Sequence, residues 1–390
     1  MKLFHPAIAT LLLALSTEGA MSSAAQGRAA PDRDVGPAGF DTIRRHADEA
    51  RTGGRLGEAV ELYSRAVRLK PSWAEGHWYL GTIAYQTDNY AACRDAFRTV
   101  IRLDTGNGAA SAFKGLCEFR LKNFGVALQD LSKAQVLEIG DPELIPVARY
   151  HRALLLTRFG HFESAVQVFA GFAREGNASP SLVEALGLAV LRIPILPDDI
   201  PPDKRDLVRL AGRATLLASS NRQGEAQEAF AELLRRYPGT PNVHYLYGAY
   251  LLHERADEAL EEFHKELHVE PNHARAMLQI ADELTRRGEF DAARSWATRA
   301  VRIEPRSFVG RRILGQIKLE VNDIAGAIVE LETAERLEAN SPSVHYALAR
   351  AYQRAGRPED ANRERAEFSR LERIQQEQRG GADAIGGVLK

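Results

Sequence analysis

The sequence has few cysteines and almost no net charge, and each shortage excludes a class of protein. Two cysteines among 390 residues, Cys93 and Cys117, are too few for a disulfide framework. Lys and Arg together (51) nearly cancel Asp and Glu (52). Net charge therefore gives no support to a protein that binds nucleic acid or another polyanion.

The apolar run near the N-terminus is too short to span a bilayer. It covers Ala7–Leu15, follows Lys2, and is followed by the small residues Ser23, Ala24 and Ala25. This pattern is typical of a secretory signal peptide. We expect residues 1–25 to be a signal peptide, 26–39 a linker, and the protein to be exported, periplasmic or secreted, with no integral span after cleavage. An uncleaved, membrane-tethered N-terminus is the alternative.

Motifs for catalysis are missing as well. The sequence has no nucleophile motif, phosphate-binding glycine loop or nucleotide fingerprint. The pattern closest to a metal site is His264 and His268, an i, i+4 pair with Glu261 and His273 nearby. We expect this pair to lie on a solvated helix face. The sequence thus predicts a protein that is not an enzyme, with no catalytic residues, no metal and no cofactor.

The sequence does contain an internal repeat. In Ala274–Ser307, apolar and small residues recur at helical spacing through Leu284, stop, and resume from Ala292. Gly288 is suited to end a first helix, and Pro305 follows the second. The pattern predicts two short helices joined by a tight turn. A chain of 390 residues is also longer than a usual single core, which favours growth by stacking.

Units of 34 residues can be laid along most of the chain. They cover 40–73, 74–107, 108–141, 146–179, 207–240, 241–273, 274–307, 308–341 and 342–375, and the unit 241–273 lacks one residue near its turn. Positions 8 and 20 of every unit hold a small residue, alanine, glycine or cysteine. Small residues there allow the two helices of a unit to cross closely. Because Cys93 takes such a position and Cys117 lies among small residues too, we expect buried free thiols; export would permit a disulfide.

This register resembles the tetratricopeptide repeat, which has a small residue at position 8, alanine at 20 and often proline at 32. Proline occurs at that last position in four units, at Pro71, Pro238, Pro271 and Pro305. Tryptophan is absent from position 4 throughout, so the repeats are divergent. The resemblance implies an all-α fold, a right-handed α-solenoid of about nine helix–turn–helix repeats.

One segment departs from the register. Residues 180–193 match a first helix, but four prolines between Pro194 and Pro202 replace the second helix. We expect an orphan helix and an extended loop over 180–206, between an N-terminal block at 40–179 and a C-terminal block at 207–375. The charged final helix is expected to close the solenoid, and residues 376–390 to form a disordered tail.

The resemblance implies that positions 2, 5, 9, 12 and 13 of each unit face a concave groove that binds peptides or proteins. These positions carry Trp78, Tyr85, Phe119 and Tyr150 in the N-terminal block, and Tyr245, Tyr346, Arg286, Arg312, Arg350 and Arg354 in the C-terminal block. Exposed aromatic rings and arginines are suited to protein recognition. Packing of these rings on the adjacent repeat is the other interpretation. No asparagine occupies position 9, which disfavours the clamp that the family uses for chaperone C-termini.

The expected function is therefore a non-enzymatic scaffold that binds protein or peptide partners in the cell envelope. Two alternatives remain open. The chain could be a structural solenoid that assembles with itself, or the binding subunit of an enzyme complex whose catalytic site is on another chain.

Overall fold

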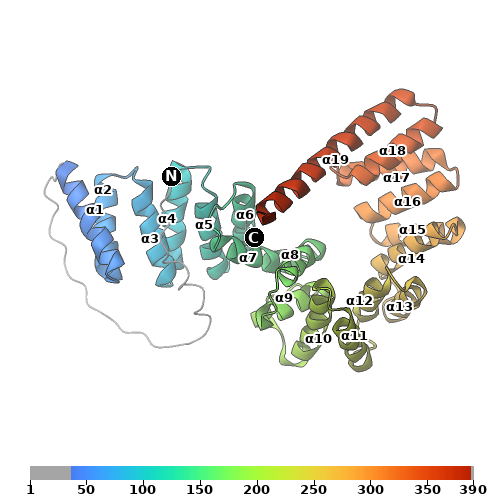
Figure 1. Cartoon of the computed structure of the whole chain (residues 1–390), viewed down its shortest axis with the longest axis horizontal. Helices are drawn as coiled ribbons and strands as arrows, with labels where there is room; N and C mark the ends of the chain where they lie inside the picture. The colour runs from blue at the N-terminus through green and yellow to red at the C-terminus, as the bar shows by residue number, and fades with distance from the viewer. Residues whose placement is uncertain (1–36, 388–390) are drawn as a thin grey trace. The chain divides into compact units, whose positions relative to one another are not determined.

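The computed structural model describes residues 37–387, with side chains from 39 to 376. All regular structure in this part of the chain is helical, with nineteen α-helices and one short 3-10 helix. Consecutive helices pack as helix–turn–helix pairs, which confirms the predicted all-α repeat fold (Figure 1). The chain divides into two compact units, and the division falls between Gly212 and Arg213.

The first unit contains four helix pairs, then one more helix and a 3-10 turn. Its elements are α1 (Pro37–Thr52), α2 (Leu56–Leu69), α3 (Ala74–Gln86), α4 (Tyr90–Leu103), α5 (Gly108–Arg120), α6 (Phe124–Val136), α7 (Leu144–Arg158), α8 (Phe162–Arg174), α9 (Pro180–Val190) and η1 (Pro197–Asp199). Helix α10 (Pro202–Ser219) contains the division between the units.

The second unit contains the remaining helices. They are α11 (Gln223–Arg236), α12 (Val243–Leu251), α13 (Ala256–Val269), α14 (Ala274–Arg286), α15 (Phe290–Ile303), α16 (Phe308–Glu320), α17 (Ile324–Leu337), α18 (Pro342–Arg354) and α19 (Pro358–Gly387). Helix α12 is short, and it precedes the turn in which the unit 241–273 lacks a residue.

The small-residue register describes how the two helices of each repeat cross. At position 20, all nine side chains are fully buried: Ala59, Cys93, Ala127, Ala165, Ala226, Ala259, Ala293, Ala327 and Ala361. At position 8, a Cβ added to Gly81 would lie 2.7 Å from the Phe97 ring, and one added to Gly315 would lie 2.6 Å from Leu331 Cγ. Larger residues at these positions would therefore overlap the partner helix.

Helix α9 is not followed by a second helix of its own repeat, and it packs on α10, the first helix of the repeat 207–240. Glycines allow it to cross α10 closely: a Cβ on Gly187 would lie 2.0 Å from the Val208 carbonyl oxygen, and one on Gly212 would lie 1.9 Å from that of Val183. The proline-rich loop also ends earlier than expected. Helix α10 begins at Pro202, because proline is well tolerated in the first turn of a helix, where no amide donor is needed.

The two ends of the described chain also differ from expectation. Helix α1 begins at Pro37, inside the segment expected to be a linker, and the predicted signal peptide lies outside the described residues. Helix α19 continues to Gly387, across most of the expected disordered tail. Its Arg-, Glu- and Gln-rich sequence has high helix propensity, and Arg370 pairs with Glu367 one turn away.

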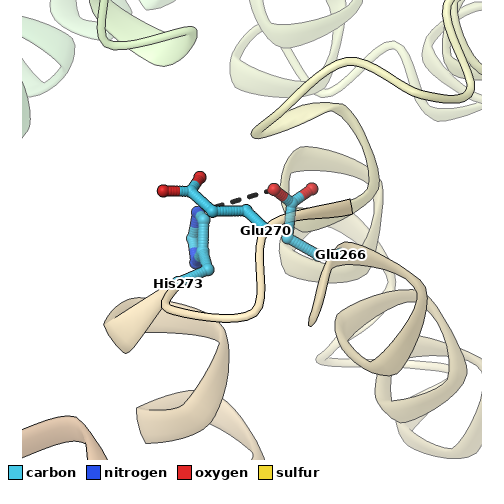
Figure 2. Close-up of side chains that lie close together, drawn as sticks. All are labelled: Glu266, Glu270 and His273. Atoms are coloured by element: carbon cyan, nitrogen blue, oxygen red, sulfur yellow. Dashed lines mark ion pairs between the residues drawn. The ribbon is translucent and has the colours of Figure 1, made fainter. Parts of the chain in front are cut away.

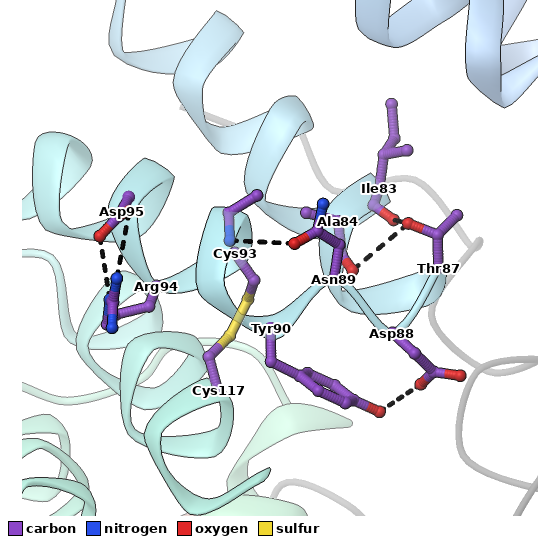
Figure 3. The surroundings of a disulfide bond; sticks show 11 residues. Ile83, Ala84, Thr87, Asp88, Asn89, Tyr90, Cys93, Arg94, Asp95 and Cys117 are labelled. Carbon is purple, nitrogen blue, oxygen red and sulfur yellow. Dashed lines mark hydrogen bonds and ion pairs between the residues drawn. A yellow bond between two sulfur atoms is a disulfide. The ribbon is translucent and has the colours of Figure 1, made fainter. Parts of the chain in front are cut away.

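A disulfide joins Cys93 of α4 to Cys117 of α5, so the expectation of free thiols is wrong (Figure 3). Both residues are fully buried, and their Cα atoms are 6.2 Å apart. The physical reason is that position 20 of one repeat and position 10 of the next face each other where α4 packs on α5. The bond therefore links two neighbouring repeats, 74–107 and 108–141.

Over residues 37–387, no helix combines the length and the apolar composition required to cross a bilayer.

Candidate functional site

The four predicted groove aromatics of the first unit are half-buried and contact the following repeat. The Trp78 ring meets Phe113 of α5 edge-on at 5.6 Å, and Tyr85 meets the same ring at 5.8 Å. Phe119 of α5 meets His151 of α7 at 4.9 Å. These rings therefore help to hold successive repeats together.

Tyr150 makes a similar contact through its hydroxyl group. The hydroxyl donates a hydrogen bond to the Ser181 carbonyl oxygen of α9 at 3.2 Å. Burial raises the pKa of Tyr150 to about 12. The structure thus assigns a packing contact to all four residues of the first unit, and their role in binding a partner stays a prediction.

The two predicted aromatics of the second unit differ in exposure. Tyr245 is only 8% exposed; its ring lies 4.9 Å from His273, and the Arg275 guanidinium lies 4.2 Å from its centroid. Tyr346 is 53% exposed and contacts Phe368 of α19 at 5.7 Å. Of the six predicted aromatics, Tyr346 is therefore the one whose ring is mostly open to a partner.

Two of the four predicted arginines are paired with acids. Arg286 lies 2.6 Å from Glu283 in its own helix, and Arg350 lies 3.0 Å from Glu320 of α16.

The other two contact neutral groups. Arg354 donates to the Leu319 carbonyl oxygen. Arg312 donates to the Gln316 side-chain oxygen at 2.8 Å. Burial lowers the pKa of Arg312, and the charge of Asp282 opposes this shift. A half-buried guanidinium next to a neutral amide retains most of its capacity to bind a carboxylate.

A set of contacts between basic and acidic side chains was not predicted. In three repeats of the second unit, a histidine or arginine at position 4 contacts an acid at position 23. The pairs are His244 with Glu262 (2.6 Å), Arg311 with Glu330 (2.5 Å) and His345 with Glu364 (2.8 Å). The sequence signal was the joint appearance of a histidine or arginine at position 4, where the family has tryptophan, and an acid 18 or 19 residues later.

Each of these histidine and arginine side chains also binds a carbonyl oxygen of the preceding repeat. The acceptors are Pro238 for His244 (3.0 Å), Pro305 for Arg311 (3.1 Å) and Ala339 for His345 (2.8 Å). One side chain thus connects the first helix of a repeat, its second helix and the turn before it. Removal of either member would leave a buried, uncompensated polar group.

The geometry of His345 requires the doubly protonated ring. Both ring nitrogens face acceptors, so both must carry a proton. Burial acts to lower the pKa of His345, but the bonds to the Ala339 carbonyl and the Glu364 carboxylate outweigh it and raise the pKa above its ordinary value.

Glu266, Glu270 and His273 form the cluster that comes nearest to a metal site (Figure 2). Glu266 is fully buried and accepts backbone N–H groups of Asn242 (2.7 Å) and Tyr245 (3.1 Å) at the start of α12. His273 accepts the Ala276 N–H through Nδ1 at 3.0 Å. Its one lone pair is therefore occupied, and we interpret the cluster as a cap for α12 and α14 rather than a set of metal ligands.

A second cluster, Glu335, His345 and Glu364, uses both nitrogens of its histidine in the ion pair described above. The two histidines noted in the sequence, His264 and His268, make separate contacts. His268 Nδ1 lies 2.7 Å from the His264 carbonyl oxygen, and the His264 ring packs on Trp296. Burial lowers the pKa of His264.

The comparisons with known proteins agree with the repeat register. The tetratricopeptide-repeat family model matches residues 44–108 and 249–307, one segment in each unit. No curated protein matches the chain.

Solved structures that resemble the chain do so at low identity. MamA from Desulfovibrio magneticus RS-1 is 19% identical, with 43% of this chain and 96% of MamA covered and a TM-score of 0.39. The Cut9–Hcn1 complex of the APC/C is 15% identical (86% and 79% covered, TM-score 0.37), and yeast Tom70 is 13% identical (89% and 96% covered, TM-score 0.32). Because all three scores are below 0.5, the fold assignment depends on the helix packing and the family match.

Proposed function

We propose that this chain of tetratricopeptide repeats is a non-enzymatic scaffold that binds a peptide or protein partner on the face formed by the first helices of its repeats. Repeats of this kind are generally an interaction fold, and stacked helix pairs offer an extended surface. The observation that carries the proposal is Tyr346, a mostly exposed ring at a position that the family directs to its partner. Large exposed aromatic residues are frequent energetic centres of interfaces.

Arg312 supports the same face. It occupies position 5 of the repeat 308–341, as Tyr346 does in the next repeat, and the two first helices α16 and α18 are in contact. An arginine with a neutral partner and an aromatic ring on adjacent helices suit a partner segment that has both a carboxylate and an apolar side chain.

We further propose that the protein acts outside the cytoplasm, in the cell envelope or as a secreted protein. Two features support this location independently. The N-terminal sequence has the pattern of a signal peptide, and Cys93 and Cys117 form a disulfide, which persists in oxidising compartments.

The test is affinity capture from the envelope fraction of the native organism, with wild type and a Tyr346→Ser/Arg312→Gln double variant. We expect wild type to retain a partner that the double variant loses. Phe159→Ser is the matched control, because Phe159 is 47% exposed at position 14, outside the predicted face. Circular dichroism confirms that all three proteins stay helical.

Equal capture by all three proteins would contradict the proposed face. A mass that rises with protein concentration, together with no captured partner, would contradict the scaffold and favour self-assembly. Sedimentation of wild type across a concentration series measures this.

A further inference from the structure

The repeat 146–179, made of α7 and α8, has two cations but lacks the acid that would pair with them. In the preceding repeat, Lys114 at position 7 pairs with Asp130, 16 residues later, at 2.5 Å. In the repeat 308–341, Arg311 at position 4 pairs with Glu330, 19 residues later. The residue 16 positions after Arg152 is also the residue 19 positions after Arg149. It is residue 168, a valine, where those two repeats have an acid.

Because residue 168 is a valine and not an acid, Arg152 has no acidic partner there. Its Nε is buried and has no hydrogen-bond acceptor, and among the described residues Arg152 makes no ion pair. Burial lowers the pKa of Arg152, and the nearby positive charge of Arg149 lowers it further. A half-buried guanidinium that also lies near another cation is costly to the fold unless an anion is bound.

Arg149 contacts an acid and an aromatic ring at the end of the repeat. Both of its Nη atoms donate to the same Glu175 oxygen at 3.1 Å, and its guanidinium lies 4.6 Å from the centre of the Phe172 ring. Glu175 is therefore the carboxylate that reaches this group of arginines.

A third arginine and a glycine complete the group. Nη2 of Arg149 and Nη2 of Arg174 lie 3.3 Å and 3.9 Å from the point that a Gly171 Cβ would occupy. The absence of a side chain at Gly171 thus leaves space between two guanidinium groups. Three positive charges and one carboxylate give this corner of the repeat a surplus of two positive charges.

We propose that α7 and α8 form a binding site for a dianionic phosphate group, held by Arg149, Arg152 and Arg174. Guanidinium groups match the geometry and charge of phosphate oxygens through paired hydrogen bonds. A dianion neutralises the surplus of positive charge. The site is separate from the predicted partner face and does not depend on the proposed function.

The test is isothermal titration calorimetry of the whole protein with inorganic phosphate at constant ionic strength. Removal of one charge in Arg152→Gln should weaken binding by roughly tenfold or more, the contribution of a charge-assisted hydrogen bond. Val168→Asp is the sharper variant, because it restores the acid found at position 23 of other repeats. It should abolish phosphate binding while the melting temperature stays equal to that of wild type or rises.

Arg235→Gln is the matched control, since it removes an exposed arginine from α11 and should leave phosphate binding unchanged. The proposal is overturned if wild type takes up no phosphate, or if binding persists in both Arg152→Gln and Val168→Asp. Glycerol 1-phosphate identifies the source of the phosphate group. Binding as tight as that of inorganic phosphate supports a phosphate carried on a larger molecule, and much weaker binding supports free phosphate.

Discussion

The buried histidine at position 4 of the last repeat, His345, makes the stability of that repeat depend on protonation. The folded-state pKa of His345 is raised above the unfolded value of about 6.5. Its stabilising effect is therefore fully present below the unfolded pKa and is lost as pH rises through the folded pKa. We expect urea unfolding to show lower stability at about pH 8.5 than at about pH 5.5.

The matched variant is His345→Arg, which copies the permanent charge of Arg311 in the repeat before. The carboxylates that face His345, Glu364 of α19 and Glu335 of α17, are present in both proteins. A difference in pH dependence between the two proteins therefore comes from the imidazole. The variant should lose the decrease in stability between the two pH values. If the two proteins have the same pH dependence, His345 is not the titrating group.

The sequence predicted the role of the small residues at the helix crossings, but it did not predict which charged residues are buried. An alanine or glycine that recurs at position 8 or 20 has one physical explanation, a close helix crossing. A histidine or glutamate has several, because most charged residues are exposed. Only the register relates His345 to Glu364, and the sequence alone does not show that both are buried.

At the scale of the helix pair, the closest crossings should tolerate no added atoms. Ala293→Leu is expected to lower the free energy of unfolding by about 1–3 kcal/mol, because Ala293 is fully buried between α14 and α15. Denaturant titration measures the change. Ala292→Leu, one residue earlier and exposed, should have little effect; equal losses would show that the register is misplaced.

The crossing of α9 and α10 should be more sensitive still. Gly187→Ala places a methyl group against the Val208 carbonyl oxygen, and backbone yields less readily than a side chain. We expect a loss of roughly 2–3 kcal/mol or more, the upper range for overpacking. Gly224→Ala in α11 meets nothing within 4 Å and should be neutral or stabilising by up to ~1 kcal/mol. Similar unfolding curves for the two variants would contradict the close contact.

The prolines after α9 show where element prediction reached its limit. They predicted the break in the register correctly, because four prolines cannot continue a helix. The sequence did not show that Pro202 would begin α10, since proline both ends helices and is accepted in their first turn.

At the scale of the whole chain, the disulfide should stabilise one unit only. The bond between Cys93 and Cys117 closes a loop of 24 residues within the first unit, and its loss should cost about 3–4 kcal/mol. Calorimetry with and without reductant measures the effect. Cys93→Ala is the matched variant, because alanine fills position 20 in the other eight repeats.

Reduced wild type and Cys93→Ala should show the same downward shift of one unfolding transition, with the other transition unchanged. A uniform shift of all unfolding, or none, would contradict this. The 34-residue register predicted nearly all of the repeats, because helix pairs that contact mainly their neighbours follow local sequence. It did not predict the disulfide, because the pairing of two cysteines depends on which faces meet between repeats.

The exchange of arginine and histidine at position 4 has a consequence for protein design. The repeat 274–307 has neither charge, because Met277 is at position 4 and Trp296 is at position 23. The chain therefore contains this contact between the two helices of a repeat in three forms: with a permanently charged arginine, with a titratable histidine, and without charge. Because the two positions act as a pair within a repeat, they can be transplanted together into another repeat. Loss of stability at high pH thereby becomes a property that can be introduced one repeat at a time in a synthetic array.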